Sequence, residues 1–281
     1  MKNKKVILIT GTSSGMGKAT AIKLHNDGHI VYATGTNVEK IKDLKDMGLK
    51  TLYLDVTNDK SMVDAVEFII QNENKIDVLI NNAGYGSYGA LEDVKMTEAR
   101  KQMDVNLFGV SRLTQLVLPH MRKQRNGYVI NIASVAAKIW EPFGCWYHSS
   151  KFALEGLSDC LRVEVKQFGI KIVIVEPGII QTNWQKIAFD KMNESLEKSE
   201  FEKDSKIKME LYGGMGSEKQ RIKASKPKLI ANKISKIINK NNPRSRYALG
   251  KGAKFMTYAK RIFPDCLMDK LTLMMYEKKT K

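Results

Sequence analysis

Short apolar segments rich in β-branched residues alternate with longer segments of helical periodicity over the first two thirds of the chain. Continuous apolar runs predict strands that are buried on both faces, and a helix between successive strands predicts that they run parallel. The pattern therefore indicates an α/β fold, a doubly wound parallel sheet of about seven strands with helices on both faces. We expect strands at residues 6–10, 30–34, 52–54, 78–80, 128–132, 172–175 and 247–249, and helices at 17–27, 38–47, 60–71, 108–124, 147–168 and 229–238.

The pattern changes after this alternating region. Residues 183–226 are polar, helix-prone and rich in Lys and Glu, and they contain the glycines of residues 213–216. We expect this segment to be an insertion into the fold. Residues 251–281 form a C-terminal extension with one or two amphipathic helices at about residues 255–275. No repeat or linker interrupts the chain, so we expect residues 1–281 to form one domain.

Composition narrows the class of protein. A chain of 281 residues, 43% hydrophobic and 27% charged, is long enough to bury a core without disulfides or a structural metal. Cys145, Cys160 and Cys266 are odd in number and widely spaced, which predicts a reducing compartment and no metal site. No apolar stretch approaches the roughly 20 residues of a spanning helix, and no signal peptide is present. We therefore expect a cytoplasmic location.

The formal net charge of +17 is concentrated near the C-terminus. Residues 186–281 hold 24 Lys and Arg against 11 Asp and Glu, and residues 219–264 hold 14 basic residues and no acidic one. Such a block is either a solvated face or a surface for an anionic partner. No nucleic-acid-binding motif accompanies it, so we expect no nucleic acid partner. Apolar residues among the basic ones at 255–274 leave peripheral membrane contact open beside packing on the domain itself.

The strand predicted at residues 6–10 leads directly into a glycine-rich turn and then a helix. Glycine lets the backbone approach a ligand closely, and the free amides of a helix N-terminus attract phosphate. The spacing is Gly-x-x-x-Gly-x-Gly, which differs from the Gly-x-Gly-x-x-Gly of the dinucleotide fingerprint. The turn predicts a pyrophosphate site, with a plain structural turn as the alternative. Its residues are Gly11, Ser13, Ser14, Gly15, Met16 and Gly17.

Further motifs follow this turn in order: Asp55-Val56, Asn81-Asn82-Ala83-Gly84, Asn106, Ser134, Tyr147-x-x-x-Lys151 and Pro177-Gly178. Together they resemble the short-chain dehydrogenase/reductase family of NAD(P)-dependent oxidoreductases over about residues 5–182. The resemblance implies a Rossmann-type fold and an enzyme acting on CH–OH groups. A dinucleotide-sensing regulator or scaffold without turnover is the alternative from another class.

Tyr147 and Lys151 lie one helical turn apart and therefore share a face of their predicted helix. Because an ammonium group favours a nearby phenolate, we expect Lys151 to lower the pKa of Tyr147 from its usual value of about 10. By resemblance, Tyr147 is the general acid or base and Ser134 donates to the substrate oxygen. The same resemblance implies that Lys151 holds the nicotinamide ribose and that Asn106 anchors a proton-relaying water.

The resemblance also implies the remaining cofactor contacts. Small residues after the fourth strand let the backbone pass close to the adenosine half of the cofactor. An acidic residue after the third strand accepts a hydrogen bond from the adenine amino group. The segment after the sixth strand borders the nicotinamide. Asn81 is expected to be structural, tying neighbouring strands together. The implied contact residues are Asp55, Val56, Asn82, Ala83, Gly84, Pro177, Gly178, Ile180 and Thr182, together with Tyr147 and Lys151.

The end of the second predicted strand bears on the choice of cofactor. An acidic residue there binds the ribose of NAD, and a basic one accepts the 2′-phosphate of NADP. This chain has neither, and the missing carboxylate removes repulsion toward a phosphate. Ser13, Thr36 and Asn37 could donate hydrogen bonds to it, with Lys40 nearby. We expect NADP(H) to be preferred, with NAD(H) as the alternative.

Aromatic residues surround the predicted catalytic tyrosine in the sequence: Trp140, Phe143, Trp146 and Trp184. They predict either an apolar substrate pocket or ordinary core and subunit contacts. Within the family, the chain is closest in pattern to the retinol and steroid dehydrogenases, which implies a lipophilic carbonyl or alcohol substrate. The insertion at residues 183–226 is the expected substrate lid. The family also implies a homodimer or homotetramer formed through the helices at 108–124 and 147–168.

Overall fold

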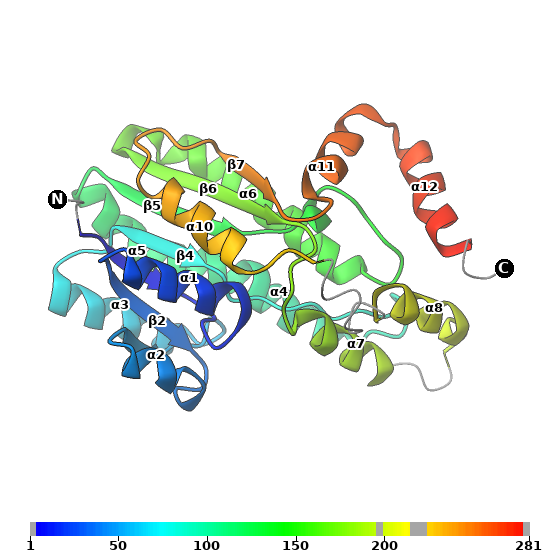
Figure 1. Cartoon of the computed structure of the whole chain (residues 1–281), viewed down its shortest axis with the longest axis horizontal. Helices are drawn as coiled ribbons and strands as arrows, with labels where there is room; N and C mark the ends of the chain where they lie inside the picture. Colours follow the sequence, from blue (N-terminus) through cyan, green and yellow to red (C-terminus); the bar gives the residue numbers. More distant parts are fainter. Residues whose placement is uncertain (1–3, 195–198, 214–223, 278–281) are drawn as a thin grey trace.

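The computed structural model describes residues 4–194, 199–213 and 224–277. One sheet of seven strands forms the centre of the fold, and all of its strands are parallel, as the alternating pattern predicts (Figure 1). The strands are β1 (Val6–Ile9), β2 (Ile30–Gly35), β3 (Lys50–Tyr53), β4 (Val78–Asn81), β5 (Gly127–Ile132), β6 (Ile170–Pro177) and β7 (Arg246–Leu249). Their spatial order is β3-β2-β1-β4-β5-β6-β7, so the order reverses between β1 and β4.

Helices cover both faces of the sheet. One face carries α1 (Gly15–Asn26), α2 (Lys42–Asp46) and α10 (Lys228–Ile237). The other carries α3 (Asp59–Glu73), α5 (Gly109–Lys123) and α6 (Cys145–Glu164). Side chains alternate along a strand, so Ile7 and Ile9 of β1 enter the first layer while Val6 and Leu8 enter the second. Both layers are apolar, which explains the continuous hydrophobic runs of the strands.

Two helical segments differ from the expectation. The segment expected at 38–47 is a short 3₁₀ turn (Glu39–Ile41) followed by α2, and only Ile41 and Leu44 of it are buried hydrophobic anchors. The helix expected from residue 108 is preceded by α4 (Met96–Met103) and a π-helical turn (Asp104–Phe108). The sequence pattern missed α4 because that helix is mostly polar and buries few apolar side chains.

The insertion after β6 contains α7 (Trp184–Glu194) and α8 (Glu202–Gly213), which lie at the end of the sheet beside α4 in Figure 1. Of the expected glycine segment, residues 214–216 lie outside the described residues. The C-terminal extension consists of α11 (Ala253–Ile262) and α12 (Asp265–Glu277), and α12 projects away from the sheet (Figure 1). Within the described residues, none of the helices has the length and apolar character needed to cross a membrane.

The three cysteines, Cys145, Cys160 and Cys266, are exposed free thiols. Over residues 4–194, 199–213 and 224–277, no group of His, Cys, Asp and Glu side chains is arranged to hold a metal ion.

Candidate active site

The reversal of strand order places the ends of β1 and β4 at the point where parallel sheets bind ligands. The glycine turn follows β1, and Asn82 follows β4. The Asn82 side chain donates to the carbonyl oxygens of Thr10 and Gly11, both at 2.9 Å, and the Thr10 hydroxyl accepts from the backbone of Asn82 and Ala83. Asn82 and Ala83 therefore hold the turn in shape from the neighbouring strand.

The turn requires glycine at its three positions. Gly11 and Gly15 have φ values of 68° and 58°, in the left-handed region that side chains disfavour. A Cβ on Gly17 would lie 2.3 Å from the carbonyl oxygen of Gly11. Ser14 precedes α1 without capping it through its side chain, so the first amides of the helix stay available to an anion. These residues fit the pyrophosphate of a dinucleotide.

The segment that follows β6, residues 178–182, lies against the glycine turn that follows β1. A Cβ on Gly15 would lie 3.1 Å from Cγ2 of Thr182, so these two residues are in close approach. Ile180 is buried and pairs with Ser225, which fixes the path of the segment. A surface cavity of about 430 Å³ lies between the N-terminus of α1 and this segment, and Gly15 and Thr182 both line it. The structure thus brings together the expected residues of the turn and of the 177–182 segment.

Ser134, Tyr147 and Lys151 meet at the same edge of the sheet. Ser134 follows β5, and its Oγ accepts from the Ala136 N–H at 3.1 Å. The same hydroxyl lies near enough to the phenol of Tyr147 to lower its pKa. Lys151 donates from Nζ to the carbonyl oxygen of Ile132 at 3.1 Å and lies 6.0 Å from the centre of the Tyr147 ring. Tyr147 is 7% exposed and Lys151 6%. A proton donor, a second hydroxyl and an ammonium group therefore face one small region.

Burial moves the two titrating groups away from the expected values. Burial raises the pKa of Tyr147 to about 12. The hydroxyl of Ser134 lowers this pKa, and the negative charge of Glu141 raises it further, but both effects are smaller than that of burial. Burial also lowers the pKa of Lys151 to about 8. The pKa of Tyr147 is therefore raised and not lowered as expected, because loss of hydration on burial has the largest effect on it. Tyr147 is held in the protonated form of a general acid.

Asn106 does not open a helix as expected but lies in the π-helical turn between α4 and α5. Its amide donates to the Tyr85 carbonyl oxygen at 2.9 Å and to Ser150 Oγ at 3.0 Å, and its Oδ1 accepts from the Tyr85 N–H. A Cβ on Gly84 would lie 3.0 Å from Asn106 Oδ1 and 3.5 Å from Lys151 Nζ. Asn106 and Lys151 thus meet across a glycine, and Asn106 also ties the segment after β4 to α6.

Aromatic side chains cover Tyr147. The Trp184 ring of α7 lies 4.8 Å from the Tyr147 ring, and the Tyr88 ring lies 5.8 Å from it. Phe143 packs against the same cluster. Trp140 instead packs with α11, so the aromatic residues that the sequence left open divide between the cluster around Tyr147 and a second cluster beside α11. The role of residues 183–226 as a substrate lid stays a prediction.

Polar contacts join helices α7 and α8 to α4 and to the segment before α6, and sequence reasoning missed them. Lys208 of α8 is 1% exposed, donates to the Pro142 carbonyl oxygen and lies 3.4 Å from Glu141. Lys191 of α7 lies 3.2 Å from Glu98 of α4. These pairs join residues far apart in the chain, and no local pattern indicates them.

His148 was also missed. Its Nδ1 lies 2.9 Å from the Ala136 carbonyl oxygen and 2.7 Å from that of Ile139, and burial lowers its pKa. It ties α6 to the segment that follows Ser134. A His beside a catalytic tyrosine is a visible signal, but its target becomes known only from the fold.

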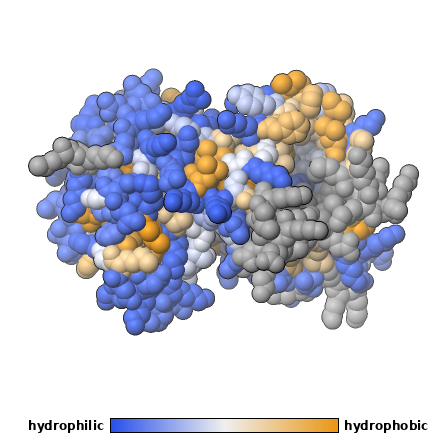
Figure 2. All heavy atoms as spheres, viewed as in Figure 1, coloured by the Kyte–Doolittle hydropathy of each residue, from blue (hydrophilic) through white to orange (hydrophobic). Residues whose placement is uncertain are grey.

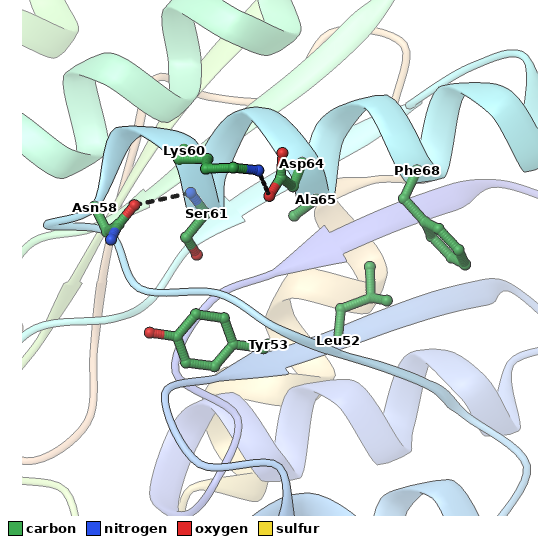
Figure 3. A pocket seen from close by; sticks show the side chains of 8 residues that line it. All are labelled: Leu52, Tyr53, Asn58, Lys60, Ser61, Asp64, Ala65 and Phe68. Atoms are coloured by element: carbon green, nitrogen blue, oxygen red, sulfur yellow. Dashed lines mark hydrogen bonds and ion pairs between the residues drawn. The ribbon is translucent and has the colours of Figure 1, made fainter.

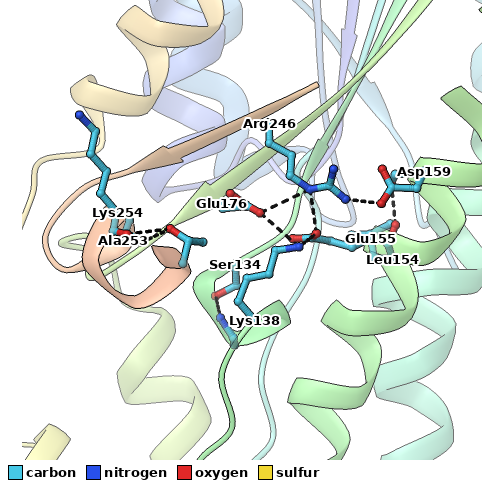
Figure 4. A network of polar contacts seen from close by, with 12 residues as sticks. Ser134, Lys138, Leu154, Glu155, Asp159, Glu176, Arg246, Ala253 and Lys254 are labelled. Carbon is cyan, nitrogen blue, oxygen red and sulfur yellow. Dashed lines mark hydrogen bonds and ion pairs between the residues drawn. The ribbon is translucent and has the colours of Figure 1, made fainter. Parts of the chain in front are cut away.

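A buried polar cluster braces the other side of the catalytic residues (Figure 4). Glu155 of α6 and Glu176 of β6 face each other, each with less than a twentieth of its surface exposed. Lys138 and Arg246 form ion pairs with both carboxylates, and Arg246 also contacts Asp159. Burial and the neighbouring Glu155 raise the pKa of Glu176 to about 7. The cluster joins the segment after Ser134, the helix of Tyr147 and the strand leading to Pro177.

The remaining expected residues lie around the rim. Thr36, Asn37 and Lys40 are exposed after β2, and Asn37 Oδ1 accepts from the backbone of Glu39 and Lys40. Asp55 accepts from the Thr57 backbone and hydroxyl at 2.9 and 2.7 Å. Glu39 is a carboxylate that sequence reasoning did not consider near this rim.

Asn81 is structural, as expected, since its amide donates to Asn131 Oδ1 at 2.8 Å and ties β4 to β5. A further cavity of about 410 Å³ lies between β3 and α3, lined by Tyr53, Asp64 and Phe68 among others (Figure 3). It is separate from the catalytic cluster and involves none of the expected site residues.

A Rossmann-type sheet with a pyrophosphate turn at its switch point and a Ser–Tyr–Lys cluster at the same edge defines a dinucleotide-dependent oxidoreductase. Residues 5–193 match the family model of the short chain dehydrogenases. The chain belongs to this family and is an oxidoreductase that acts on CH–OH groups.

Relatives agree with this assignment. The chain is 38% identical to a 3-ketodihydrosphingosine reductase of Bacteroides thetaiotaomicron over 88% of each chain, and 31% identical to a probable short-chain type dehydrogenase/reductase (VdlC) of Helicobacter pylori over 94% of this chain and 95% of that one. A short-chain dehydrogenase of Streptomyces avermitilis matches the whole chain and 98% of its own with a TM-score of 0.81 and 29% identity.

Proposed function

We propose that the enzyme interconverts a carbonyl group and a secondary alcohol on a lipophilic substrate, with NADP(H) as the preferred cofactor. The observation that carries this proposal is the burial of Tyr147 beside Lys151, next to the hydroxyl of Ser134 and under an aromatic cover. A regulator that only binds a dinucleotide needs no such acid, so turnover is favoured over sensing.

In the direction of reduction, the Tyr147 phenol donates its proton to the carbonyl oxygen while the Ser134 hydroxyl donates a hydrogen bond to the same atom. The bound nicotinamide supplies the hydride that the carbonyl carbon receives. The Lys151 ammonium stabilises the phenolate that Tyr147 becomes. Gly11, Gly15 and the first amides of α1 would hold the pyrophosphate.

The preference for NADP(H) is supported by the exposed donors after β2, Thr36 and Asn37, and by Lys40. A metagenomic short-chain oxidoreductase of the same fold, 24% identical with a TM-score of 0.67, is described in complex with NADP. Glu39 is an exposed carboxylate next to these donors, and its negative charge would oppose the binding of a 2′-phosphate.

The lipophilic substrate is supported by the apolar cover of Trp184, Tyr88 and Phe143 over Tyr147. The relative from Bacteroides thetaiotaomicron is described as acting on 3-ketodihydrosphingosine, a long-chain ketone. A long-chain ketone is therefore the first substrate class to test.

The test compares initial rates with NADPH and NADH on 3-ketodihydrosphingosine and on butan-2-one, in detergent below its inhibitory concentration. We expect kcat/KM for the long-chain ketone to exceed that for butan-2-one by about a hundred-fold or more, because its chain buries more apolar surface. We also expect NADPH to bind about ten-fold more tightly than NADH. Equal rates on the two ketones would contradict the substrate class, and equal affinities would contradict the cofactor preference.

A further inference from the structure

The outer face of α11 carries a stripe of exposed apolar residues. Phe255, Tyr258 and Ile262 are spaced by three and four residues, so they lie on one side of the helix. They are 74%, 61% and 73% exposed, which is unusual for three large hydrophobic side chains in a row. The stripe has no cover within the described part of the chain.

The stripe is additional to the face by which α11 packs on the protein. Met256, Ala259 and Phe263 lie on a neighbouring side, about 100° around the helix axis from the stripe, and pack against Ile139 and Trp140. The helix is therefore docked, and its outer residues are not the ones needed to hold it. A helix with two apolar faces presents the second one to something else.

The next helix continues this surface. Leu267, Leu271 and Met274 of α12 share one side of that helix and are 36%, 41% and 42% exposed. Figure 2 shows hydrophobic residues gathered over the part of the molecule where Figure 1 places α11 and α12. We call Phe255, Tyr258, Ile262, Leu267, Leu271 and Met274 the terminal apolar surface.

Charge around the terminal apolar surface is mostly positive. Asp265 and Asp269 are exposed, but each has a partner within the protein: Asp265 pairs with Lys260, and Asp269 accepts from the Trp140 indole at 2.7 Å. Lys254, Arg261 and Lys270 are exposed, and none of them forms an ion pair within the described residues. The surface is therefore apolar with a basic border.

This combination fits the headgroup region of an anionic membrane. Apolar side chains enter the acyl boundary while Lys and Arg contact anionic lipid heads. A second copy of the chain brings the same Lys254 and Arg261 against these cations, and like charges oppose that pairing. A nucleic acid would leave the apolar stripe unburied. We propose that α11 and α12 dock the enzyme on the surface of an anionic lipid bilayer.

The docking places the bilayer next to the substrate cover. α12 packs against α8, and α11 packs against the turn that follows Ser134. A lipophilic substrate could then pass from the bilayer to the aromatic cluster without crossing water. This consequence rests on the proposed function, whereas docking itself does not.

The test measures how much of the full-length protein sediments with vesicles of phosphatidylglycerol and phosphatidylcholine, or of phosphatidylcholine alone, at moderate salt. We expect strong binding only to the vesicles that contain phosphatidylglycerol. The double variant Phe255→Ser with Ile262→Ser should lower the partition coefficient by about ten-fold or more, because two apolar side chains no longer leave water. The matched control, Val38→Ser with Met47→Ser, removes two exposed apolar residues elsewhere and should bind like wild type.

A second pair separates local charge from the overall charge of +17. Lys254→Gln with Arg261→Gln should weaken binding more than Lys45→Gln with Lys123→Gln, although both lose two positive charges. Equal effects of the two pairs, or undiminished binding by the serine variant, would show that only net charge binds and would overturn the proposal.

If the wild type does not bind vesicles but self-associates, and the serine variant does not self-associate, then the terminal apolar surface is an interface between copies of the chain. That result would also overturn the proposal. Sedimentation needs no substrate, so its failure is separate from a failure of the proposed function. Activity of the serine variant on detergent-solubilised ketone should equal that of wild type.

Discussion

Burial acts in opposite directions on Tyr147 and Lys151. Both side chains are almost fully enclosed, so each charged form loses hydration, which raises the pKa of the phenol to about 12 and lowers that of the amine to about 8. Near neutral pH, the tyrosine therefore holds its proton and the lysine keeps its charge. That pair of states suits the reduction of a carbonyl.

Removing the acid should stop the chemistry and spare the cofactor site. For Tyr147→Phe, we expect the turnover number to fall by about 10²–10⁴ because the proton donor is lost. The glycine turn and α1 do not depend on this hydroxyl, so the dissociation constant of NADPH, measured by fluorescence titration, should stay within about two-fold. Unchanged turnover would contradict the assigned role.

The pH profile of reduction should follow Lys151. Its pKa of about 8 lies below the ordinary 10.5, so the ammonium is present below pH 8 and is lost above it, while Tyr147 stays protonated. We expect kcat/KM to be level below about pH 8 and to fall about ten-fold per unit above it. Burial also lowers the pKa of Lys208 to about 8, so Lys208 could cause the same fall in kcat/KM. If Lys151 is the cause, the variant Lys208→Met must show the same fall above pH 8. A level profile up to about pH 10 would contradict this reading.

Helices α7 and α8 position aromatic groups that the sheet alone does not supply. Trp184 occupies the space over Gly86, where a Cβ would lie 2.3 Å from its ring. The same ring touches Tyr147 and Tyr88. Trp184 therefore packs on Gly86 and on Tyr147 at once, and under the proposed function it would form one wall of the substrate site.

Shortening this wall should weaken substrate binding more than chemistry. For Trp184→Ala, we expect KM for the long-chain ketone to rise by about ten-fold or more and kcat to change less, since apolar contact is lost. Phe68→Ala on α3 removes an exposed aromatic side chain away from the site and should leave both parameters unchanged. A fall in kcat with unchanged KM would place Trp184 in the chemistry instead.

The Glu155–Glu176 pair links α6 to β6, and its effect on the free energy of unfolding depends on pH. The pKa of Glu176 is raised from 4.5 to about 7, so the folded protein binds more protons than the unfolded chain between these values. Stability should therefore decrease as pH rises through that window and stay lower above it. For Glu176→Gln, which cannot ionise, we expect Tm at pH 8 to exceed that of wild type by about 2–6 °C, and the two values to converge near pH 5.

The control for this prediction is Glu67→Gln, which neutralises an exposed carboxylate of α3 and should not alter the pH dependence of Tm. If the Tm of the wild type, relative to that of Glu176→Gln, rises between pH 5 and pH 8, then the pKa of Glu176 is not raised on folding and the prediction is wrong.

The complete protein presents a second apolar face besides α11 and α12. Phe108, Phe152 and Val163 are 59%, 43% and 71% exposed on the helices through which the family resemblance implies assembly. We expect a dimer or tetramer in light scattering after size exclusion. Phe152→Asp should shift it toward the monomer because a buried, unpaired charge opposes association. Leu229→Asp on α10 should not, and a monomeric wild type would contradict the prediction.

Much of this protein could be predicted from local pattern. Apolar runs identified β1, β2, β4, β5 and β6, since a strand buried on both faces is apolar throughout. The edge strands β3 and β7 are only partly buried, and shorter apolar runs indicated them. Gly11, Gly15 and Gly17 were identifiable because their spacing is dictated by a backbone that no other residue tolerates. Tyr147 and Lys151 were recognisable because one helical turn puts them on the same face. The polar helix α4 was missed because little apolar surface marks it.

The amino-acid sequence by itself determined the strands, most of the helices and the glycine turn after β1, because each depends on neighbours in the chain. It also indicated, through the family resemblance, the residues that we propose for catalysis. Only the tertiary structure decided the pKa of Tyr147, the pairing of Glu155 with Glu176, the fastening of α8 by Lys208 and the outward face of α11. These depend on burial and on contacts between distant segments. Hydration lost on folding and charges brought together by it are not encoded in any single stretch of residues.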